Sequence, residues 1–339
     1  MKKIINVGNV VLGAGKPVIQ SMTNTLTTDV ESTVCQIEKL VKAGAELVRV
    51  SVPDERSAAA VKEIALRSGV PIIADIHYSA KPALIAIENG AKKIRINPGN
   101  MSKNDVSEVV RKCIEYDVPI RVGVNKGSLV GDKSPSALAN KAIEYAKIIE
   151  DEGFDKIVLA VKSSDVRETV EAYRILDKLC DYPLHVGLTE SGTERSGTLK
   201  SAVAIGALLL DGIGDTIRVS LATDPVKEVY AAKKILRAVG IDKNYVEVIA
   251  CPTCARTKID VSGLAERIET ITANFSIPLK IAVMGCTVNG IGESKGADFG
   301  VAGGAGKSVL FKDGVILKTV DNEEIENEII ELIKEKTNG

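Results

Sequence analysis

The chain has 339 residues, of which 45% are hydrophobic and 26% charged, and its 44 Lys and Arg nearly balance its 45 Asp and Glu to leave a formal net charge of −1. This length predicts about two globular domains, and the charge balance argues against nucleic-acid binding driven by bulk positive charge. Aromatic residues make up only 3% and Trp is absent, which argues against base-stacking surfaces.

The apolar segments of the chain are short. The longest, 202–210, is far below the roughly 20 residues that a membrane span needs. The apolar stretch after Lys3 is too short for the hydrophobic region of a signal peptide. We therefore expect a cytoplasmic protein that does not bind membranes. Its six cysteines should serve as buried thiols, metal ligands or catalytic groups, because disulfides are rare in that compartment.

Short β-branched segments recur at a near-regular interval through the first 240 residues, and a helical pattern follows each of them. The segments begin near Val18, Glu46, Pro71, Lys93, Pro119, Lys156, Pro183 and Asp215. Strand–helix alternation predicts an α/β fold with a parallel sheet. Eight such units favour a closed (β/α)8 TIM-type barrel over residues 1–240, with an open doubly wound sheet as the alternative.

Polar and charged residues stand near the carboxyl ends of these predicted strands, although strands buried on both faces are normally apolar. They are Arg49 with Ser51, Asp75 with His77, Arg95 with Asn97, Arg121 with Asn125, Lys162, Glu190, and Arg218 with Ser220. Residues two or four apart point to the same side of a strand. The carboxyl ends of barrel strands form the mouth in which active sites lie, so we expect these side chains to gather there.

The predicted mouth is positively charged. Its five cations (Arg49, Arg95, Arg121, Lys162 and Arg218) outnumber its two acids by three. Arginine binds phosphate well because its planar guanidinium donates to two oxygens at once. We therefore predict a small phosphorylated or diphosphorylated substrate, with structural ion pairs at the strand ends as the alternative.

The strand–helix rhythm stops after Gly240. Short strands are predicted near 246–250, 279–284 and 298–302. A hairpin with its turn at Lys312-Asp313-Gly314 and a helix over about 322–336 follow. We therefore predict a small α+β domain over residues 241–339.

Three cysteines belong to this second domain: Cys251 and Cys254 form a C-x2-C pair, and Cys286 follows later. Thiols at neighbouring strand ends can converge on one metal site and leave a fourth position open. An iron–sulfur cluster with one exchangeable iron is the favoured interpretation. A structural zinc site, a redox-active thiol pair and inert thiols remain as alternatives. Cys35, Cys113 and Cys180 fall in separate barrel helices and are interpreted as buried or incidental thiols.

Together these residues resemble the hydroxymethylbutenyl diphosphate synthase family of the non-mevalonate isoprenoid pathway. The resemblance runs along almost the whole chain and is carried by residues 20–25, 74–77, 121–128, 212–221, 251–256 and 286–293. The family implies a barrel followed by an iron–sulfur domain that holds one 4Fe-4S cluster per chain.

The resemblance also implies a role for each site residue. The cluster would be held by Cys251, Cys254, Cys286 and Glu293, and Glu293 would also return a proton. The diphosphate would be bound by Arg49, His77, Arg95, Arg121, Lys162, Arg218 and Ser220. The catalytic residues nearest the substrate ring would be Asp75, Asn97, Asn125 and Glu190. The family usually has Pro where this chain has Ile291, which leaves the placement of Glu293 less constrained.

The implied reaction converts 2-C-methyl-D-erythritol 2,4-cyclodiphosphate to 4-hydroxy-3-methylbut-2-enyl diphosphate by two-electron reductive ring opening and dehydroxylation. Reduced ferredoxin or flavodoxin would supply the electrons, and the enzyme would be a head-to-tail homodimer. Two alternatives remain: a non-redox pterin-type transferase barrel with a structural zinc domain, and a non-catalytic iron–sulfur carrier.

Overall fold

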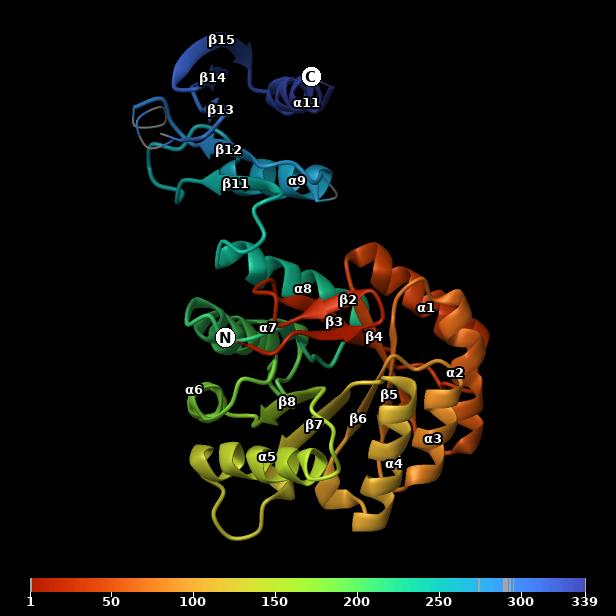
Figure 1. Cartoon of the computed structure of the whole chain (residues 1–339). Helices are drawn as coiled ribbons and strands as arrows, with labels where there is room; N and C mark the ends of the chain where they lie inside the picture. Colours follow the sequence, from red (N-terminus) through yellow and green to blue (C-terminus); the bar gives the residue numbers. More distant parts are fainter. Residues whose placement is uncertain (1, 274, 289–291, 293, 295, 339) are drawn as a thin grey trace. The chain divides into compact units, whose positions relative to one another are not determined.

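The structure of the chain, a computed structural model, describes residues 2–273, 275–288, 292, 294 and 296–338 (Figure 1). The chain divides into two compact units, residues 1–241 and 242–339. Each unit has its own hydrophobic core. Among the described residues, no helix is both long and apolar enough to cross a membrane.

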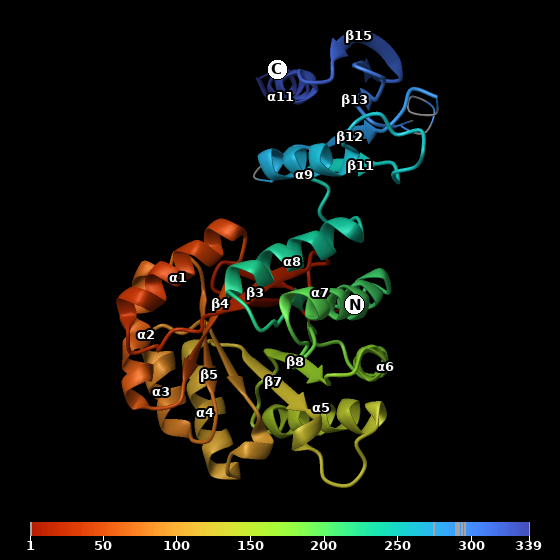
Figure 2. The same cartoon turned by 180° about the vertical axis from the view of Figure 1, so that it is seen from behind.

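The first unit is an eight-stranded parallel barrel, which confirms the predicted fold. Its strands are β3 (Val18–Met22), β4 (Leu47–Val52), β5 (Ile72–Ile76), β6 (Lys93–Ile96), β7 (Ile120–Asn125), β8 (Ile157–Lys162), β9 (His185–Val186) and β10 (Thr216–Ile217). The helices that alternate with them are α1 (Val30–Ala43), α2 (Glu55–Arg67), α3 (Ala80–Glu88), α4 (Lys103–Tyr116), α5 (Pro135–Glu150), α6 (Val166–Leu179), α7 (Glu194–Leu210) and α8 (Pro225–Ala238). In both views the helices lie outside the strands (Figures 1 and 2).

The sheet closes on itself. Its strand order is β8-β7-β6-β5-β4-β3-β10-β9. A parallel bridge between Leu159 and Leu184 joins the two ends of this order, and the N–H of Leu159 donates to the carbonyl of Pro183 at 3.0 Å. This closing contact excludes the open-sheet alternative.

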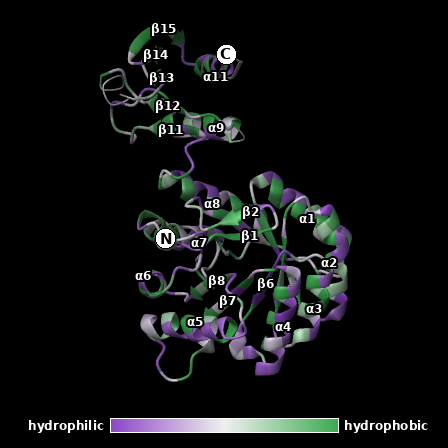
Figure 3. Ribbon diagram, viewed as in Figure 1, coloured by the Kyte–Doolittle hydropathy of each residue, from purple (hydrophilic) through white to green (hydrophobic). Residues whose placement is uncertain are grey.

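Local sequence signals begin and end the barrel helices. The Asp29 side chain accepts from the N–H of Ser32 and caps α1. Gly44 ends this helix with a φ of 117°, a left-handed conformation that glycine adopts without strain. The barrel helices carry both hydrophilic and hydrophobic residues (Figure 3), and the buried Val34, Ile37 and Leu40 of α1 recur at helical spacing. Their apolar faces and the outward face of the strands form the core of this unit.

A two-stranded hairpin that the sequence analysis did not predict covers the amino-terminal end of the barrel. It consists of β1 (Ile5–Val7) and β2 (Val10–Leu12). Its apolar side chains pack against Val18, Leu47, Ile73 and Val158, which come from four barrel strands. The hairpin therefore seals the end of the barrel opposite the mouth.

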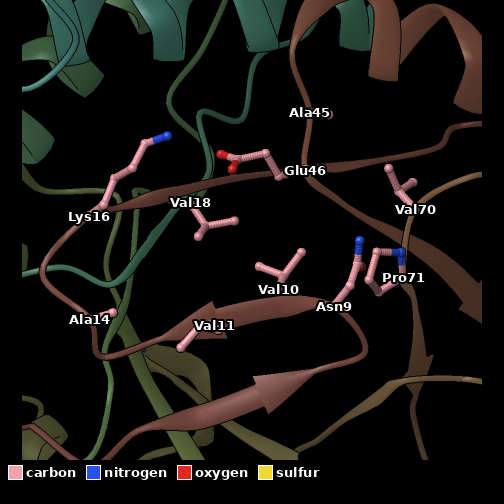
Figure 4. A pocket seen from close by; sticks show the side chains of 10 residues that line it. All are labelled: Asn9, Val10, Val11, Ala14, Lys16, Val18, Ala45, Glu46, Val70 and Pro71. Atoms are coloured by element: carbon pink, nitrogen blue, oxygen red, sulfur yellow. The ribbon is translucent and has the colours of Figure 1, made fainter.

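A hollow of about 410 Å³ lies beside this hairpin. Val10 and Val18 point toward each other across it (Figure 4). Its lining residues are Asn9, Val10, Val11, Ala14, Lys16, Val18, Ala45, Glu46, Val70 and Pro71. The Glu46 carboxylate accepts from the N–H of Ile19 at 3.2 Å, which is a structural contact. None of the predicted site residues that the structure describes lines this hollow, and the amino-terminal face of a barrel usually serves stability.

The second unit is built on a five-stranded mixed sheet in the order β11-β12-β13-β14-β15. The strands are β11 (Val246–Ala250), β12 (Leu279–Met284), β13 (Phe299–Ala302), β14 (Lys307–Lys312) and β15 (Val315–Asp321). β11, β12 and β13 are parallel, and β13, β14 and β15 are antiparallel. The sheet packs with α9 (Val261–Thr272), which was not predicted, and α11 (Ile325–Asn338). Asp313 and Gly314 both have positive φ, as the predicted Asp-Gly hairpin turn requires.

Candidate functional site

The barrel strands bring several predicted mouth residues into adjacent register. Asp75 on β5 lies beside Arg95 on β6, and Arg95 lies beside Arg121 on β7. Asn125 at the end of β7 lies beside Lys162 at the end of β8. Neighbouring strands are about 4.8 Å apart, so the charged side chains of this group lie close together.

Asp75 is the carboxylate at the centre of this group. It is 5% exposed, and its two oxygens lie 3.1 Å from Arg95 Nη1 and 3.6 Å from Arg49 Nε. Burial raises the pKa of Asp75, but the charges of Arg49 and Arg95 outweigh it, so the net shift is downward. Asp75 is therefore an ionised acid that holds two arginines.

Arg49 and Arg218 reach the same sulfur atom. Arg49 Nη2 lies 2.9 Å and Arg218 Nη1 3.5 Å from Met22 Sδ. A thioether is only a weak acceptor, so these donors remain available to a stronger one. Burial, opposed in part by Asp75, lowers the pKa of Arg49 to about 10. Met22 falls within the motif at residues 20–25 but was not predicted as a mouth residue.

Arg121 and Lys162 are cations without a carboxylate partner among the residues that the structure covers. Arg121 is 2% exposed, and its Nε has no hydrogen-bond partner there. Burial, followed by the neighbouring arginines, lowers the pKa values of both Arg121 and Lys162 well below their usual range. Arg95 Nε and Arg218 Nε are likewise buried without a partner. Unpaired buried donors are costly, so the cluster is suited to an anion.

Two glycines, one within β7 and one directly after β9, leave room for these cations. A Cβ at Gly123 would lie 3.1 Å from Arg95 Nε and 3.4 Å from Arg121 Nη1. A Cβ at Gly187 would lie 3.3 Å from Lys162 Nζ and 2.3 Å from the Arg218 carbonyl. Any larger residue would displace the mouth residues.

The remaining predicted mouth residues lie at the same ends of their strands. His77 follows β5 and is half-buried, and its Nδ1 has no partner within the described part of the chain. Ser220, half-buried, follows β10. Glu190, after β9, is exposed and has a φ of 52°. Such a conformation is uncommon outside glycine and is enriched at functional sites.

Asn97 has a local structural role. Its Oδ1 accepts from the N–H of Gly99 at 3.2 Å, which caps the short 3-10 helix η1 (Pro98–Asn100). Its Nδ2 donates to Asn100 Oδ1 at 3.4 Å. The structure thus places Asn97 after β6 but shows its side chain engaged within its own loop.

A buried polar layer lies beneath the mouth and was not predicted. It contains Gln20, Lys93, His185 and Thr216, each at most 2% exposed. His185 Nδ1 lies 2.7 Å from Thr216 Oγ1, while its Nε2 has no partner in the described chain. Burial and the surrounding cations lower the pKa of His185 well below 6.5, so the ring is neutral. Lys93 lies on the same side of β6 as Arg95 but at the start of the strand. A prediction based on polar residues at the carboxyl ends of strands therefore did not include it.

Replacing Lys93 with Met is expected to stabilise the barrel by about 1–3 kcal/mol near neutral pH. Lys93 is 0% exposed, and its Nζ has no hydrogen-bond partner among the described residues. Burial lowers its pKa in the folded state, so the unfolded chain binds more protons between the folded and unfolded pKa values. Wild-type stability therefore rises with pH in that window, and the gain from Lys93→Met shrinks.

Urea unfolding at several pH values measures this gain. Lys92→Met is the matched control, because Lys92 is the exposed residue directly before Lys93 and its replacement should change stability little. A Lys93→Met protein less stable than wild type would contradict the prediction.

The second unit places two of its cysteines at the carboxyl ends of neighbouring strands, and Cys254 follows three residues after Cys251. Cys251 directly follows β11, and Cys286 follows β12 across Gly285, where Ala250 lies beside Val283. The N–H of Gly285 donates to Cys251 Sγ at 3.1 Å and links the two strand ends. Cys254 is exposed, and hydrogen bonding from the backbone and then the side chain of Arg256 lowers its pKa, which favours the thiolate.

Cys251, Cys254 and Cys286 are the candidate metal ligands of the second unit. Within the described ranges, no group of three or more His, Cys, Asp or Glu side chains is gathered closely enough to hold a metal ion. Glu293 and Ile291 lie outside the described residues. The donor chemistry nevertheless fits an iron–sulfur cluster, since Cys251 and Cys286 follow neighbouring strands and the pKa of Cys254 is shifted toward the thiolate. Cys35, Cys113 and Cys180 are free thiols of the barrel unit.

The fold of the barrel unit is similar to those of solved enzymes. Yersinia pestis dihydropteroate synthase matches with a TM-score of 0.53 and 16% identity over 70% of this chain and 98% of that one. Type I 3-dehydroquinate dehydratase from Clostridium difficile matches with a TM-score of 0.54 and 13% identity over 70% of this chain and 99% of that one. At these identities the likeness shows the fold alone.

Sequence comparison identifies the family. The GcpE TIM-barrel domain matches residues 2–233, and the GcpE protein C-terminal domain matches residues 247–335. The 4-hydroxy-3-methylbut-2-en-1-yl diphosphate synthase (flavodoxin) of Caldanaerobacter subterraneus subsp. tengcongensis is 49% identical over 97% of this chain and 96% of its own. The enzyme of the same name from Clostridium perfringens is 48% identical over 97% of each chain. The chain therefore belongs to the GcpE family.

Proposed function

We propose that this protein is a 4-hydroxy-3-methylbut-2-en-1-yl diphosphate synthase that acts on 2-C-methyl-D-erythritol 2,4-cyclodiphosphate. The observation that carries the proposal is the cluster of buried, under-partnered cations at the barrel mouth of a GcpE-family chain. Diphosphate oxygens are the acceptors that such donors bind most strongly. The reaction is a reductive dehydroxylation, and the names of the relatives support reduced flavodoxin as the electron donor. Reduced ferredoxin is the alternative electron donor that we propose.

The cations bind the diphosphate and so position the ring. Arg49 and Arg95 are held by Asp75, which aims them into the mouth. The proposed diphosphate ligands are Arg49, His77, Arg95, Arg121, Lys162, Arg218 and Ser220. Binding energy at the diphosphate, remote from the carbon that is reduced, then orients the reacting part of the substrate.

The residues proposed to lie nearest the ring are Asp75, Asn97, Asn125 and Glu190. Asp75 acts through its two arginines, because its oxygens are already engaged. Glu190 is the exposed acid among them and its backbone is held in an uncommon conformation. Glu293 is the proposed donor of a proton to the product.

One 4Fe-4S cluster per chain is part of the proposal, held by Cys251, Cys254 and Cys286 with Glu293 as the fourth ligand. When bound, the cluster supplies two electrons one at a time and a Lewis-acidic iron. The overall reaction consumes two electrons and two protons, cleaves the ring and releases one oxygen as water. The chain contributes the thiolates, and the Gly285 N–H that donates to Cys251 Sγ is suited to a sulfur that carries negative charge.

The family resemblance also supports a head-to-tail homodimer and a cytoplasmic enzyme, and both belong to the proposal. A pterin-type transferase is not favoured, because the likeness to dihydropteroate synthases is limited to the fold, at 16% identity. The two relatives named above, at 48–49% identity, are 4-hydroxy-3-methylbut-2-en-1-yl diphosphate synthases.

Anaerobic turnover of the cyclodiphosphate with a chemically reduced one-electron donor tests this function. Cluster-loaded protein is expected to form 4-hydroxy-3-methylbut-2-enyl diphosphate and to contain about four irons per chain. Fully loaded protein that forms no product would refute the assignment. Colourless, anaerobically prepared protein with one zinc per chain would instead favour the non-redox alternative.

Diphosphate binding is expected to take up protons, partly through Lys162, in the pH range between the pKa values of this lysine in the free and in the bound protein. Burial, followed by four neighbouring arginines, lowers the pKa of Lys162 in the free protein. A bound anion favours the ammonium form and raises that pKa, so affinity should fall as pH rises between the two values.

Calorimetry of inorganic pyrophosphate in buffers of different ionisation enthalpy measures the uptake. When it binds pyrophosphate, the Lys162→Met protein should take up fewer protons than wild type. Its affinity for pyrophosphate should also depend less on pH. Because the protonation of pyrophosphate itself is common to both proteins, the difference between them isolates the lysine. Equal proton uptake would contradict the prediction.

A further inference from the structure

Glu228 is a buried acid next to the mouth that the sequence analysis did not find. It lies in the first turn of α8 and is 5% exposed. Its Oε1 accepts from the backbone N–H of Leu221 at 2.7 Å. This contact ties the helix to the loop that carries Ser220 and fixes the plane of the carboxyl group.

The second oxygen of Glu228 faces the mouth. Oε2 lies 3.7 Å from Arg218 Nη2, and it is buried without a hydrogen-bond partner among the described residues. Burial raises the pKa of Glu228, while Arg218, the Leu221 N–H and Lys162 oppose that rise. The ionised carboxylate of Glu228 is therefore favourable in this buried position only because a cation lies beside it.

Arg218 is held from two sides. Its Nη1 lies 3.5 Å from Met22 Sδ, its Nη2 faces Glu228, and its buried Nε has no partner within the described chain. The side chain is 16% exposed, so part of the guanidinium reaches the mouth. Met22 is a weak acceptor, so Glu228 is the only charged group shown to hold this guanidinium within the described residues.

We infer that Glu228 is a positioning residue that orients Arg218 toward a phosphate group bound in the barrel mouth. The inference rests on the proposed diphosphate site. It makes a prediction opposite in sign to simple electrostatics: a negative charge beside an anion site weakens binding by repulsion, so its removal would tighten binding if Glu228 had no positioning role.

Glu228→Gln separates these two effects. The N–H of Leu221 needs an oxygen acceptor, so the glutamine amide must turn its oxygen to Leu221 and its NH2 toward Arg218. The loop contact is then kept, while Arg218 faces a donor instead of an acceptor. We expect the Kd for inorganic pyrophosphate and the KM for the cyclodiphosphate to rise about tenfold, with kcat and Tm little changed.

Two further variants complete the experiment. Glu194→Gln is the control, because Glu194 is an exposed acid at the start of α7 that pairs with Lys227 of α8 at 2.7 Å, and its loss should leave Kd unchanged. Adding Glu228→Gln to Arg218→Met should have no further effect on Kd, since the positioned group is gone. If Glu228 had only a structural role, Glu228→Gln would lower Tm and would weaken binding by the same factor in wild type and in Arg218→Met.

The outcomes distinguish failure of the inference from failure of the proposed site. If Glu228→Gln binds pyrophosphate as tightly as wild type or more tightly, while Arg218→Met binds it weakly, the positioning role is wrong and the site stands. If Arg218→Met also binds like wild type, Arg218 does not bind the diphosphate and the proposed site is overturned at this position.

Discussion

Arg121→Met is expected to lower kcat/KM for the cyclodiphosphate about 100-fold or more without destabilising the fold. Arg121 is 2% exposed, has no carboxylate partner in the described chain, and lies on β7 directly beside Arg95. Each hydrogen bond to a charged group contributes about 1.5–3 kcal/mol, and a guanidinium can make two to a diphosphate. In the free protein the same cation is a cost, because it is buried beside other cations.

Arg121→Met should thus weaken diphosphate binding without lowering the free energy of unfolding. Titration with inorganic pyrophosphate and urea unfolding of the same preparations measure the two quantities. Arg111→Met is the control, since Arg111 is an exposed arginine of α4 and its loss should alter neither. Loss of stability together with loss of binding would mean that Arg121 is a structural residue, and unchanged binding would remove it from the site.

Cys286→Ser is expected to lose the cluster and the activity together. Cys286 follows β12 directly after Gly285, whose N–H donates to Cys251 Sγ. A serine hydroxyl is a poor replacement for thiolate at iron. Iron content should fall from about four per chain toward zero, and the visible absorption of the cluster should disappear.

Cys35→Ser provides the matched control. Cys35 is an exposed free thiol of α1 in the barrel unit, so its replacement should leave iron content and turnover at the wild-type level. Full iron content and activity in Cys286→Ser would exclude Cys286 as a ligand. Parallel losses in both variants would point to general damage of the preparation.

Most of the barrel followed from sequence because its signals are local. Each of the eight strands begins at its predicted position or one to two residues later. Alternation with period two then indicated which residues of each strand face the inside of the barrel. Asp75 of β5 and Arg95 of β6, both predicted to face inward, do lie 3.1 Å apart. The missed elements are the β1–β2 hairpin, whose strands have only three residues each, and α9, whose apolar residues Val261, Leu264 and Ile268 do recur at helical spacing.

The missed site residues share one property: their role depends on what another element places beside them. Gly123 and Gly187 matter because arginine and lysine side chains lie over them. Glu228 looks like an ordinary first-turn acid of a helix, a position that the helix dipole alone explains. Asn97 shows the reverse, since it matched the mouth pattern and yet caps its own loop.

By itself, the sequence determined the strand–helix order, the charged residues at the carboxyl ends of the strands and the cysteine spacing, because propensity, periodicity and motif spacing are properties of short segments. Only the tertiary structure decided that the sheet closes between β8 and β9, that Asp75 holds Arg49 and Arg95, and that Glu228 faces Arg218. Those contacts join residues far apart in the chain, and their geometry depends on how whole strands and helices pack. The near-zero net charge of −1 therefore conceals a local excess of buried cations that exists only once the barrel is formed.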